Sequence, residues 1–141
     1  MAHKILLVDD DNEFRTVMAL ALEISGYAVI EAADGVSALD LLRRERPDAI
    51  LSDLHMPLMD GRTFCKRVRA ENALAAIPFV ILSAYIESDR SNALPDALPD
   101  VVPDFLPDFL EDTPADCCFS KQNSFSSLLT QLEKLIARRG R

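Results

Sequence analysis

The chain has 141 residues, a length that suits one domain with a single buried core. Hydrophobic residues make up 49% and charged residues 27%, which is typical of a globular protein and excludes a disordered or collagen-like chain. The net charge of −8 disfavours a partner with a phosphate backbone, so we expect no direct binding to nucleic acid. No apolar run approaches the ~18–20 residues of a membrane helix, and no secretory h-region precedes the first strand-like run. We therefore expect a cytoplasmic protein without membrane contact.

The cysteines indicate a reducing compartment. There are three, and Cys117 and Cys118 are adjacent, which does not suit a disulfide framework. No Cys-x-x-Cys or His/Cys cluster offers a zinc site. We expect the three side chains to act as small buried hydrophobic groups.

The chain begins with a short apolar run followed by an amphipathic segment. The run Ile5–Val8 predicts a buried strand that ends in three aspartates. Apolar residues then recur at spacings of three and four from Phe14 to Leu22, which predicts a helix. Asp10 or Asp11 is a suitable N-cap for this helix, and Gly26 a suitable stop.

The same alternation repeats along the chain. A strand is predicted at Ala28–Ile30, and a helix at Val36–Arg46, after Asp34 and before Pro47. Further strands are predicted at Ala49–Asp53, Phe79–Ser83 and Cys117–Ser120. Further helices are predicted at Arg62–Ala70 and, from the spacing of its apolar residues, at Phe125–Ile136, with Arg138 and Arg139 at its negative end. Strands that alternate with helices and consist of continuous apolar runs predict a doubly wound five-stranded parallel sheet, with helices on both faces.

The segment between the fourth and fifth strands is too long for an ordinary connection. Residues 84–116 number 33, whereas a helix with its two loops needs roughly 16–24. Within this segment a Pro-Asp dipeptide recurs every four residues, at 95–96, 99–100, 103–104 and 107–108. Each proline lacks an N–H and disfavours α geometry in the residue before it, so we expect turns or extended chain over 94–110 in place of a regular fourth helix.

The repeat also carries apolar residues and an acidic stripe. The seven apolar residues that follow its prolines would leave a large hydrophobic surface in water, so part of it should pack on the sheet or on a partner. The four aspartates recur at one phase, and we expect them to face outward. The segment 94–110 is therefore a possible docking site for a protein target.

Polar residues gather where the predicted strands end. Asp9 and Asp10 follow the first strand, Asp53 ends the third, Ser83 ends the fourth and Lys121 follows the fifth. In an open parallel sheet, ligands bind outside the carboxyl ends of the strands. Three carboxylates gathered there would repel one another, and a hard divalent cation such as Mg²⁺ would relieve that repulsion. Together with an ammonium and a hydroxyl group, this set suits phosphoryl transfer to a carboxylate.

Four motifs in this order resemble the receiver domains of two-component response regulators. They are Val8–Asp11, Ser52–Gly61, Leu82–Ala84 and Lys121. The resemblance implies the strand order 2-1-3-4-5 and a single receiver domain over 1–141, with an atypical insertion at about 88–115. It implies a phosphoryl-accepting switch that promotes its own phosphorylation and dephosphorylation and is not otherwise an enzyme. The partner it implies is a sensor histidine kinase or a histidine phosphotransfer protein.

The resemblance also assigns roles to individual residues. It implies that Asp53 accepts the phosphoryl group, and that Asp9, Asp10, Asp53 and the backbone carbonyl of His55 bind Mg²⁺. Ser83 and Lys121 would bind the phosphoryl oxygens.

The sequence departs from the receiver pattern at two places near its end. Gln122 replaces the proline that usually follows the lysine, and Cys118 replaces the usual aromatic residue of the switch. These departures leave open a pseudo-receiver, an interaction module that keeps the fold with altered or lost switching. A Mg²⁺-dependent aspartyl-phosphate phosphatase is a further alternative, although such enzymes need a second aspartate where His55 stands.

Overall fold

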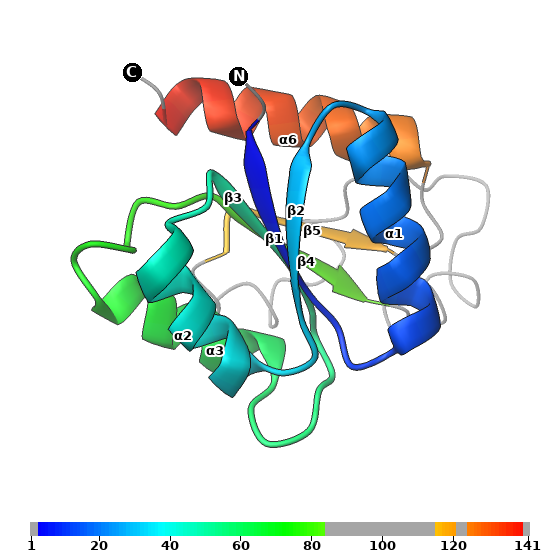
Figure 1. Cartoon of the computed structure of the whole chain (residues 1–141). Coiled ribbons are helices and arrows are strands. Elements are labelled where there is room, and N and C mark those ends of the chain that lie inside the picture. Colours follow the sequence, from blue (N-terminus) through cyan, green and yellow to red (C-terminus); the bar gives the residue numbers. More distant parts are fainter. Residues whose placement is uncertain (1–2, 84–114, 121–123, 140–141) are drawn as a thin grey trace, which may run out of the picture.

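The computed structural model describes residues 3–83, 115–120 and 124–139 and contains one five-stranded parallel sheet (Figure 1). The strand order is β2-β1-β3-β4-β5, so the predicted fold class and order are confirmed. The strands are β1 (Lys4–Val8), β2 (Ala28–Ala32), β3 (Ala49–Asp53), β4 (Phe79–Ser83) and β5 (Cys117–Ser120). Because β1 and β3 are adjacent and parallel, the carboxyl ends of these two central strands lie at the same edge of the sheet.

Four helices cover the two faces of the sheet in the described part of the chain. They are α1 (Asn12–Ile24), α2 (Gly35–Glu45), α3 (Gly61–Ala70) and α6 (Phe125–Arg139). In Figure 1, α1 and α6 lie on one face and α2 and α3 on the other. None of the helices in these ranges is long and apolar enough to cross a membrane.

Alternating strand residues divide the core into two layers. In β1, Leu6 and Val8 pack with α2 and α3, whereas Ile5 and Leu7 pack with α1 and α6. All four side chains are fully buried. This two-sided burial explains why the strands are continuous apolar runs and not alternating ones. Cys65 of α3 lies in the first layer, where burial raises the pKa of its thiol to about 12. It is therefore the inert hydrophobic group that was expected.

Aspartates start three of the helices. Asp11, Asp34 and Asp60 each accept a hydrogen bond from a backbone N–H two or three residues later, at 2.8–3.1 Å. These bonds satisfy amides that have no partner within the helix. Asp11, and not Asp10, is thus the N-cap of α1, and Asp10 remains available at the end of β1.

Helix ends follow the expected signals with small shifts. α1 stops at Ile24, and Gly26 has a φ of +102°, which glycine adopts without strain. The predicted α2 ran to Arg46, but the helix ends one residue earlier. Arg46 has a φ of +48° and forms a left-handed cap before Pro47.

Several predictions fall outside the described residues. These are the conformation of 94–110, nearly all of the insertion at 88–115, and the positions of Lys121 and Gln122. Cys118 lies in β5, but its side chain is also outside the description.

Candidate functional site

Three carboxylates meet at the ends of β1 and β3. One oxygen each from Asp9, Asp10 and Asp53 lies within 4.8 Å of the others. Asp9 and Asp53 are nearly buried, with 1% and 7% of their surface exposed, whereas Asp10 is exposed. The cluster thus has a buried floor and one side open to solvent.

The register of the sheet brings these residues together across 44 positions of sequence. Val8 of β1 lies opposite Ser52 of β3 in the parallel ladder. Asp9 and Asp53 each follow that pair by one residue, so both carboxylates emerge at the same edge. The convergence expected from the strand ends is therefore present for all three acidic residues.

Backbone and side-chain bonds fix Asp9 in place. Its N–H donates to the carbonyl of Ala32 in β2 at 3.1 Å. Its Oδ1 accepts from the N–H of Asp11 at 2.9 Å, and its carbonyl accepts from Nη1 of Arg15 at 2.6 Å. The loop between β1 and α1 is thus held from both β2 and α1.

Gly61 lets the first turn of α3 approach Asp53 closely. The Gly61 N–H donates to the Leu54 carbonyl at 2.7 Å, and the Leu54 N–H donates to the Leu82 carbonyl at 3.1 Å. A Cβ at position 61 would collide with the carbonyl oxygen of Asp53. Only glycine therefore fits where this helix begins.

The loop from β3 to α3 has a buried base and an exposed tip. Met56 and Met59 are buried, whereas the side chain of His55 is exposed. Leu58, at the tip, has a φ of +71° and is 88% exposed. The Met59 N–H donates to the Pro57 carbonyl at 2.7 Å, which closes a tight turn around Leu58.

The chemistry of this cluster suits a hard cation. Its donors are all carboxylate oxygens, which are the ligands that Mg²⁺ and Ca²⁺ take in proteins. A cation bound between them would offset the repulsion of three like charges.

The remaining predicted residues are only partly placed. Ser83 is the last residue of β4, and β4 pairs with β3 so that Leu82 lies opposite Asp53. The backbone of Ser83 therefore lies at the same edge of the sheet. Its side chain and the whole of Lys121 are outside the described residues.

A comparison with known families matches residues 5–102 to the response regulator receiver domain. The chain belongs to this family. Its members are the phosphoryl-accepting switches of two-component signalling. The alternative of a Mg²⁺-dependent aspartyl-phosphate phosphatase gains no support, because the receiver match spans both the acidic cluster and His55.

Curated relatives are longer regulators. A probable transcriptional regulator, ycf27, from Porphyridium aerugineum is 40% identical over 92 residues, which are 64% of this chain and 37% of that protein. The transcriptional regulatory protein CseB of Streptomyces coelicolor is 40% identical over 84 residues, 60% of this chain and 35% of that protein. The chain thus matches little more than a third of the length of these relatives.

Solved receiver domains share this fold. One is the receiver domain of a Pseudomonas aeruginosa sensor histidine kinase, with a magnesium ion coordinated in its active-site cleft. It has a TM-score of 0.76 and 27% identity, and the match covers 97% of this chain and 99% of that one. A chemotaxis response regulator of Vibrio cholerae has a TM-score of 0.75 and 27% identity, over 96% of this chain and 99% of that one.

Two features of the site were not predicted from the sequence. Gly61 was noted only as part of a motif, although a glycine directly after the N-cap aspartate is a signal for close backbone approach. Nothing in the sequence indicates that Arg15 belongs to the site, because arginine is common on the polar face of an amphipathic helix. Its contact with the Asp9 carbonyl depends on the three-dimensional path of the loop.

Proposed function

We propose that this receiver domain accepts a phosphoryl group on Asp53 in a Mg²⁺-dependent reaction with a phosphohistidine donor. The observation that carries the proposal is the cluster of Asp9, Asp10 and Asp53 at the carboxyl edge of the sheet. We further propose that residues 1–141 form one receiver domain with an insertion at about 88–115. We propose the cytoplasm as the location of the protein.

The transfer balances without any further reactant. A carboxylate oxygen of Asp53 bonds to phosphorus as the phosphorus–nitrogen bond of the donor breaks. The electron pair of that bond returns to the donor imidazole. Asp53 is suited to this role because it ends a central strand and is held by the backbone contacts of Leu54 and Gly61.

The other polar residues would bind the cation and the transferred group. Asp9, Asp10 and Asp53 would hold Mg²⁺ together with the His55 carbonyl. When bound, Mg²⁺ would neutralise the carboxylates and the charge of the phosphoryl oxygens. Ser83 and Lys121 would bind those oxygens, a role that rests on the family pattern and on the place of Ser83 at the end of β4.

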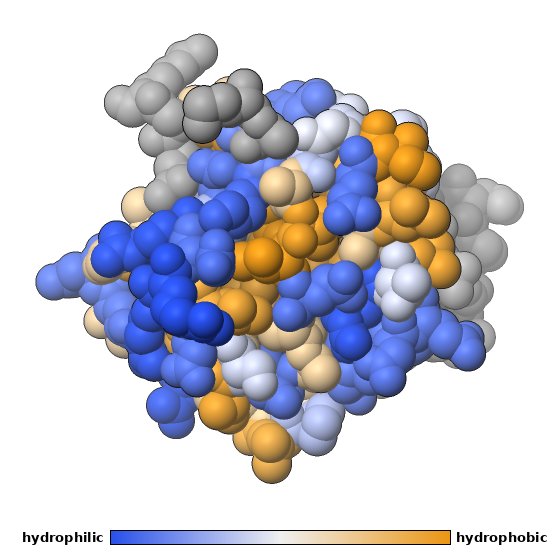
Figure 2. Space-filling view, viewed as in Figure 1, coloured by the Kyte–Doolittle hydropathy of each residue, from blue (hydrophilic) through white to orange (hydrophobic). Residues whose placement is uncertain are grey.

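The exposed face of α1 supports a protein donor. Val17, Leu20 and Ile24 are 68%, 57% and 78% exposed and lie at helical spacing along one side of α1. Figure 2 shows the apolar surface over this helix. The stripe begins in the second turn of α1, and the helix itself starts directly after the acidic cluster. A histidine-bearing helical domain of a sensor kinase or phosphotransfer protein could therefore pack on the stripe while its phosphohistidine reaches Asp53.

Intact-mass measurement tests the proposal directly. The protein is incubated with Mg²⁺ and acetyl phosphate, and a gain of one phosphoryl group is expected. Asp53→Asn should abolish the gain, whereas Asp40→Asn, which removes an exposed carboxylate of α2, should leave it unchanged. Chelation of Mg²⁺ should suppress it. Undiminished modification of Asp53→Asn would refute the assignment, and a folded wild-type protein that gains no mass would favour the pseudo-receiver.

A further inference from the structure

Arg15 occupies an unusual place for a cation. It is the fourth residue of α1, near the positive end of the helix dipole, where a positive charge is disfavoured. Its side chain is nevertheless 16% exposed and turned toward the protein. Its contacts must therefore offset both the unfavourable interaction with the helix dipole and the free-energy cost of removing the guanidinium group from water.

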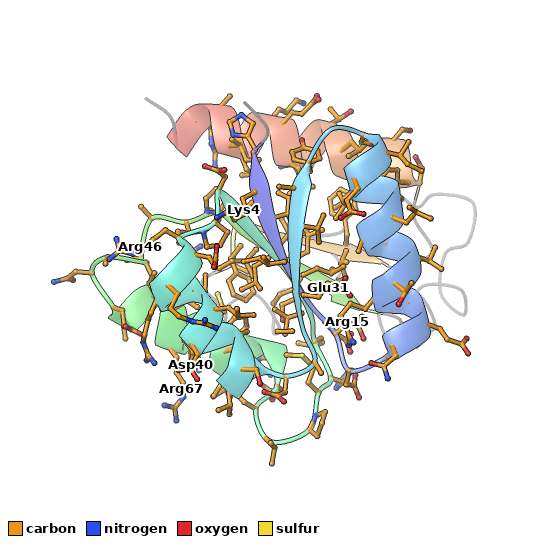
Figure 3. The ribbon with its side chains drawn as sticks, in the orientation of Figure 1. Lys4, Arg15, Glu31, Asp40, Arg46 and Arg67 are labelled. Carbon is orange, nitrogen blue, oxygen red and sulfur yellow. The ribbon has the colours of Figure 1, made fainter. Side chains whose placement is uncertain are left out.

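The guanidinium group joins three parts of the chain. Nη1 donates to the Asp9 carbonyl at 2.6 Å, Nε donates to Oε1 of Glu31 at 3.1 Å, and Nη2 donates to Oδ1 of Asn12 at 2.7 Å. We call these groups the Arg15 network. Figure 3 shows Arg15 and Glu31 close together between α1 and β2. The planar fork of arginine suits such a site, because several donors have fixed directions.

The Arg15 network includes a hydrogen bond to the backbone carbonyl of Asp9, a proposed cation ligand. The Asp9 carbonyl belongs to the residue whose carboxylate lies in the acidic cluster, and the loop continues directly into Asp10. Glu31 lies in β2, whose next residue, Ala32, accepts the N–H of Asp9. The end of β2 and the first turns of α1 therefore fix the Asp9–Asp10 loop from both sides.

We propose that Arg15, oriented by Glu31 and Asn12, is a positioning residue that holds Asp9 and Asp10 in the geometry that binds Mg²⁺. This inference rests on the proposed function, because it assumes that the cluster binds the cation. Arg15 itself would contact neither the cation nor the phosphoryl group. It acts through the carbonyl of Asp9.

The sign of the effect separates positioning from simple electrostatics. Arg15 carries a positive charge next to the backbone of Asp9, a proposed cation ligand, so its removal would strengthen cation binding if only charge mattered. Loss of positioning weakens cation binding instead. Residues that orient metal ligands typically contribute 10–100-fold to metal affinity. We therefore expect Arg15→Met to weaken Mg²⁺ binding by about tenfold or more, against the electrostatic trend.

Calorimetric titration with Mg²⁺ provides the test, using the whole chain. Arg15→Met and Glu31→Gln are compared with a matched pair of controls, Arg43→Met and Glu71→Gln. Arg43 and Glu71 form a surface ion pair at 3.0 Å near the end of α2, so these controls make the same changes of charge away from the acidic cluster. Arg15→Met should bind Mg²⁺ most weakly, Glu31→Gln should show a smaller loss, and the controls should match the wild type.

Further measurements separate the possible failures. Far-UV circular dichroism and melting without Mg²⁺ report whether each variant is folded. Glu31→Gln removes a negative charge, so a loss of affinity in it also follows the electrostatic trend; Arg15→Lys, which keeps the charge, decides the question if Arg15→Met does not fold. Arg15→Lys should recover part of the affinity, because an ammonium can reach the Asp9 carbonyl but cannot bond to all three partners in a fixed plane. Wild-type protein that does not bind Mg²⁺ would refute the proposed function itself. Mg²⁺ binding by folded Arg15→Met or Glu31→Gln that equals or exceeds the wild type would overturn the positioning role alone.

Discussion

The first residue of α3, Gly61, lies against the backbone of Asp53, and a Cβ at position 61 would overlap the Asp53 carbonyl oxygen. The helix can start so close to the proposed phosphoacceptor only because position 61 has no side chain. Any larger residue must displace either α3 or the end of β3. The identity of residue 61 and the position of Asp53 are therefore linked.

We expect Gly61→Ala to lower both stability and phosphorylation. Overpacking of this kind costs about 1–3 kcal/mol in unfolding free energy, and the displaced strand end should slow the reaction with acetyl phosphate. Chemical denaturation and intact mass would measure the two effects. Gly26→Ala is the control, because its strain comes from a φ of +102° with no atom near the added Cβ. It should lose stability but phosphorylate normally, and a Gly61→Ala protein that phosphorylates at the wild-type rate would contradict the expectation.

Millimolar Mg²⁺ should raise the melting temperature of the protein. The cation would bind only where the sheet has brought the carboxylates together, and at 100 times its Kd such a ligand adds about 2.7 kcal/mol. Asp10→Ala should remove most of this increment while raising the melting temperature without Mg²⁺, because one of three like charges is gone. Scanning calorimetry would measure both changes. Asp40→Ala is the control, and its increment with Mg²⁺ should equal that of the wild type. An equally unchanged increment in Asp10→Ala would exclude Asp10 as a ligand.

Transfer from a protein donor should depend on the apolar stripe of α1. Leu20→Glu places a charge in the middle of that stripe, so the rate from a phosphorylated histidine kinase should fall by tenfold or more if burial there contributes ~1.4 kcal/mol or more. The rate with acetyl phosphate should not change, because a small donor needs no docking surface. Val36→Glu, on an exposed position of α2, is the matched control. Equal losses with both donors would indicate damage to the site instead of lost docking.

The pair of Arg43 and Glu71 should make a small, pH-dependent contribution to stability. The hydrogen bond and the charge of Arg43 lower the pKa of the Glu71 carboxyl below its ordinary value of 4.5. A carboxylate with a lowered pKa in the folded state stabilises it above the unfolded pKa, and this contribution is lost as pH falls through the folded value. NMR titration should show the Glu71 pKa rising in Arg43→Met, and the melting-temperature difference between this variant and wild type should shrink below about pH 4. A Glu71 titration that is the same in both proteins would contradict the assignment.

The fold could be predicted from sequence because local signals agreed with one another. Continuous apolar runs predicted all five strands, and β2 differed most, extending two residues past Ile30 through Glu31 and Ala32. Glu31 is polar because it lies on an edge strand and binds Arg15, so hydrophobicity alone could not include it.

The site could be predicted only for those polar residues that directly follow the end of a predicted strand. Asp9, Asp10 and Asp53 could be placed together because parallel strands direct their carboxyl ends to one edge. Whether Asp10 or Asp11 caps α1 could not be decided, since both residues suit an N-cap and the choice depends on the backbone geometry of the loop. Arg15 was missed for a similar reason: its contacts with Asp9 and Glu31 depend on the path of the loop between β1 and α1 and on the position of β2.

Asp116 determines where β5 begins. Its carboxylate accepts from the N–H of Phe79 at 2.8 Å and from Arg69 of α3 at 2.9 Å, and its own N–H donates to the Phe79 carbonyl at 2.9 Å. These contacts at the start of β5 fix its register against β4. The closure entropy of a flexible connection rises only with the logarithm of its length. Natural variation between these two strands can therefore change the length of the connection greatly while the sheet stays the same.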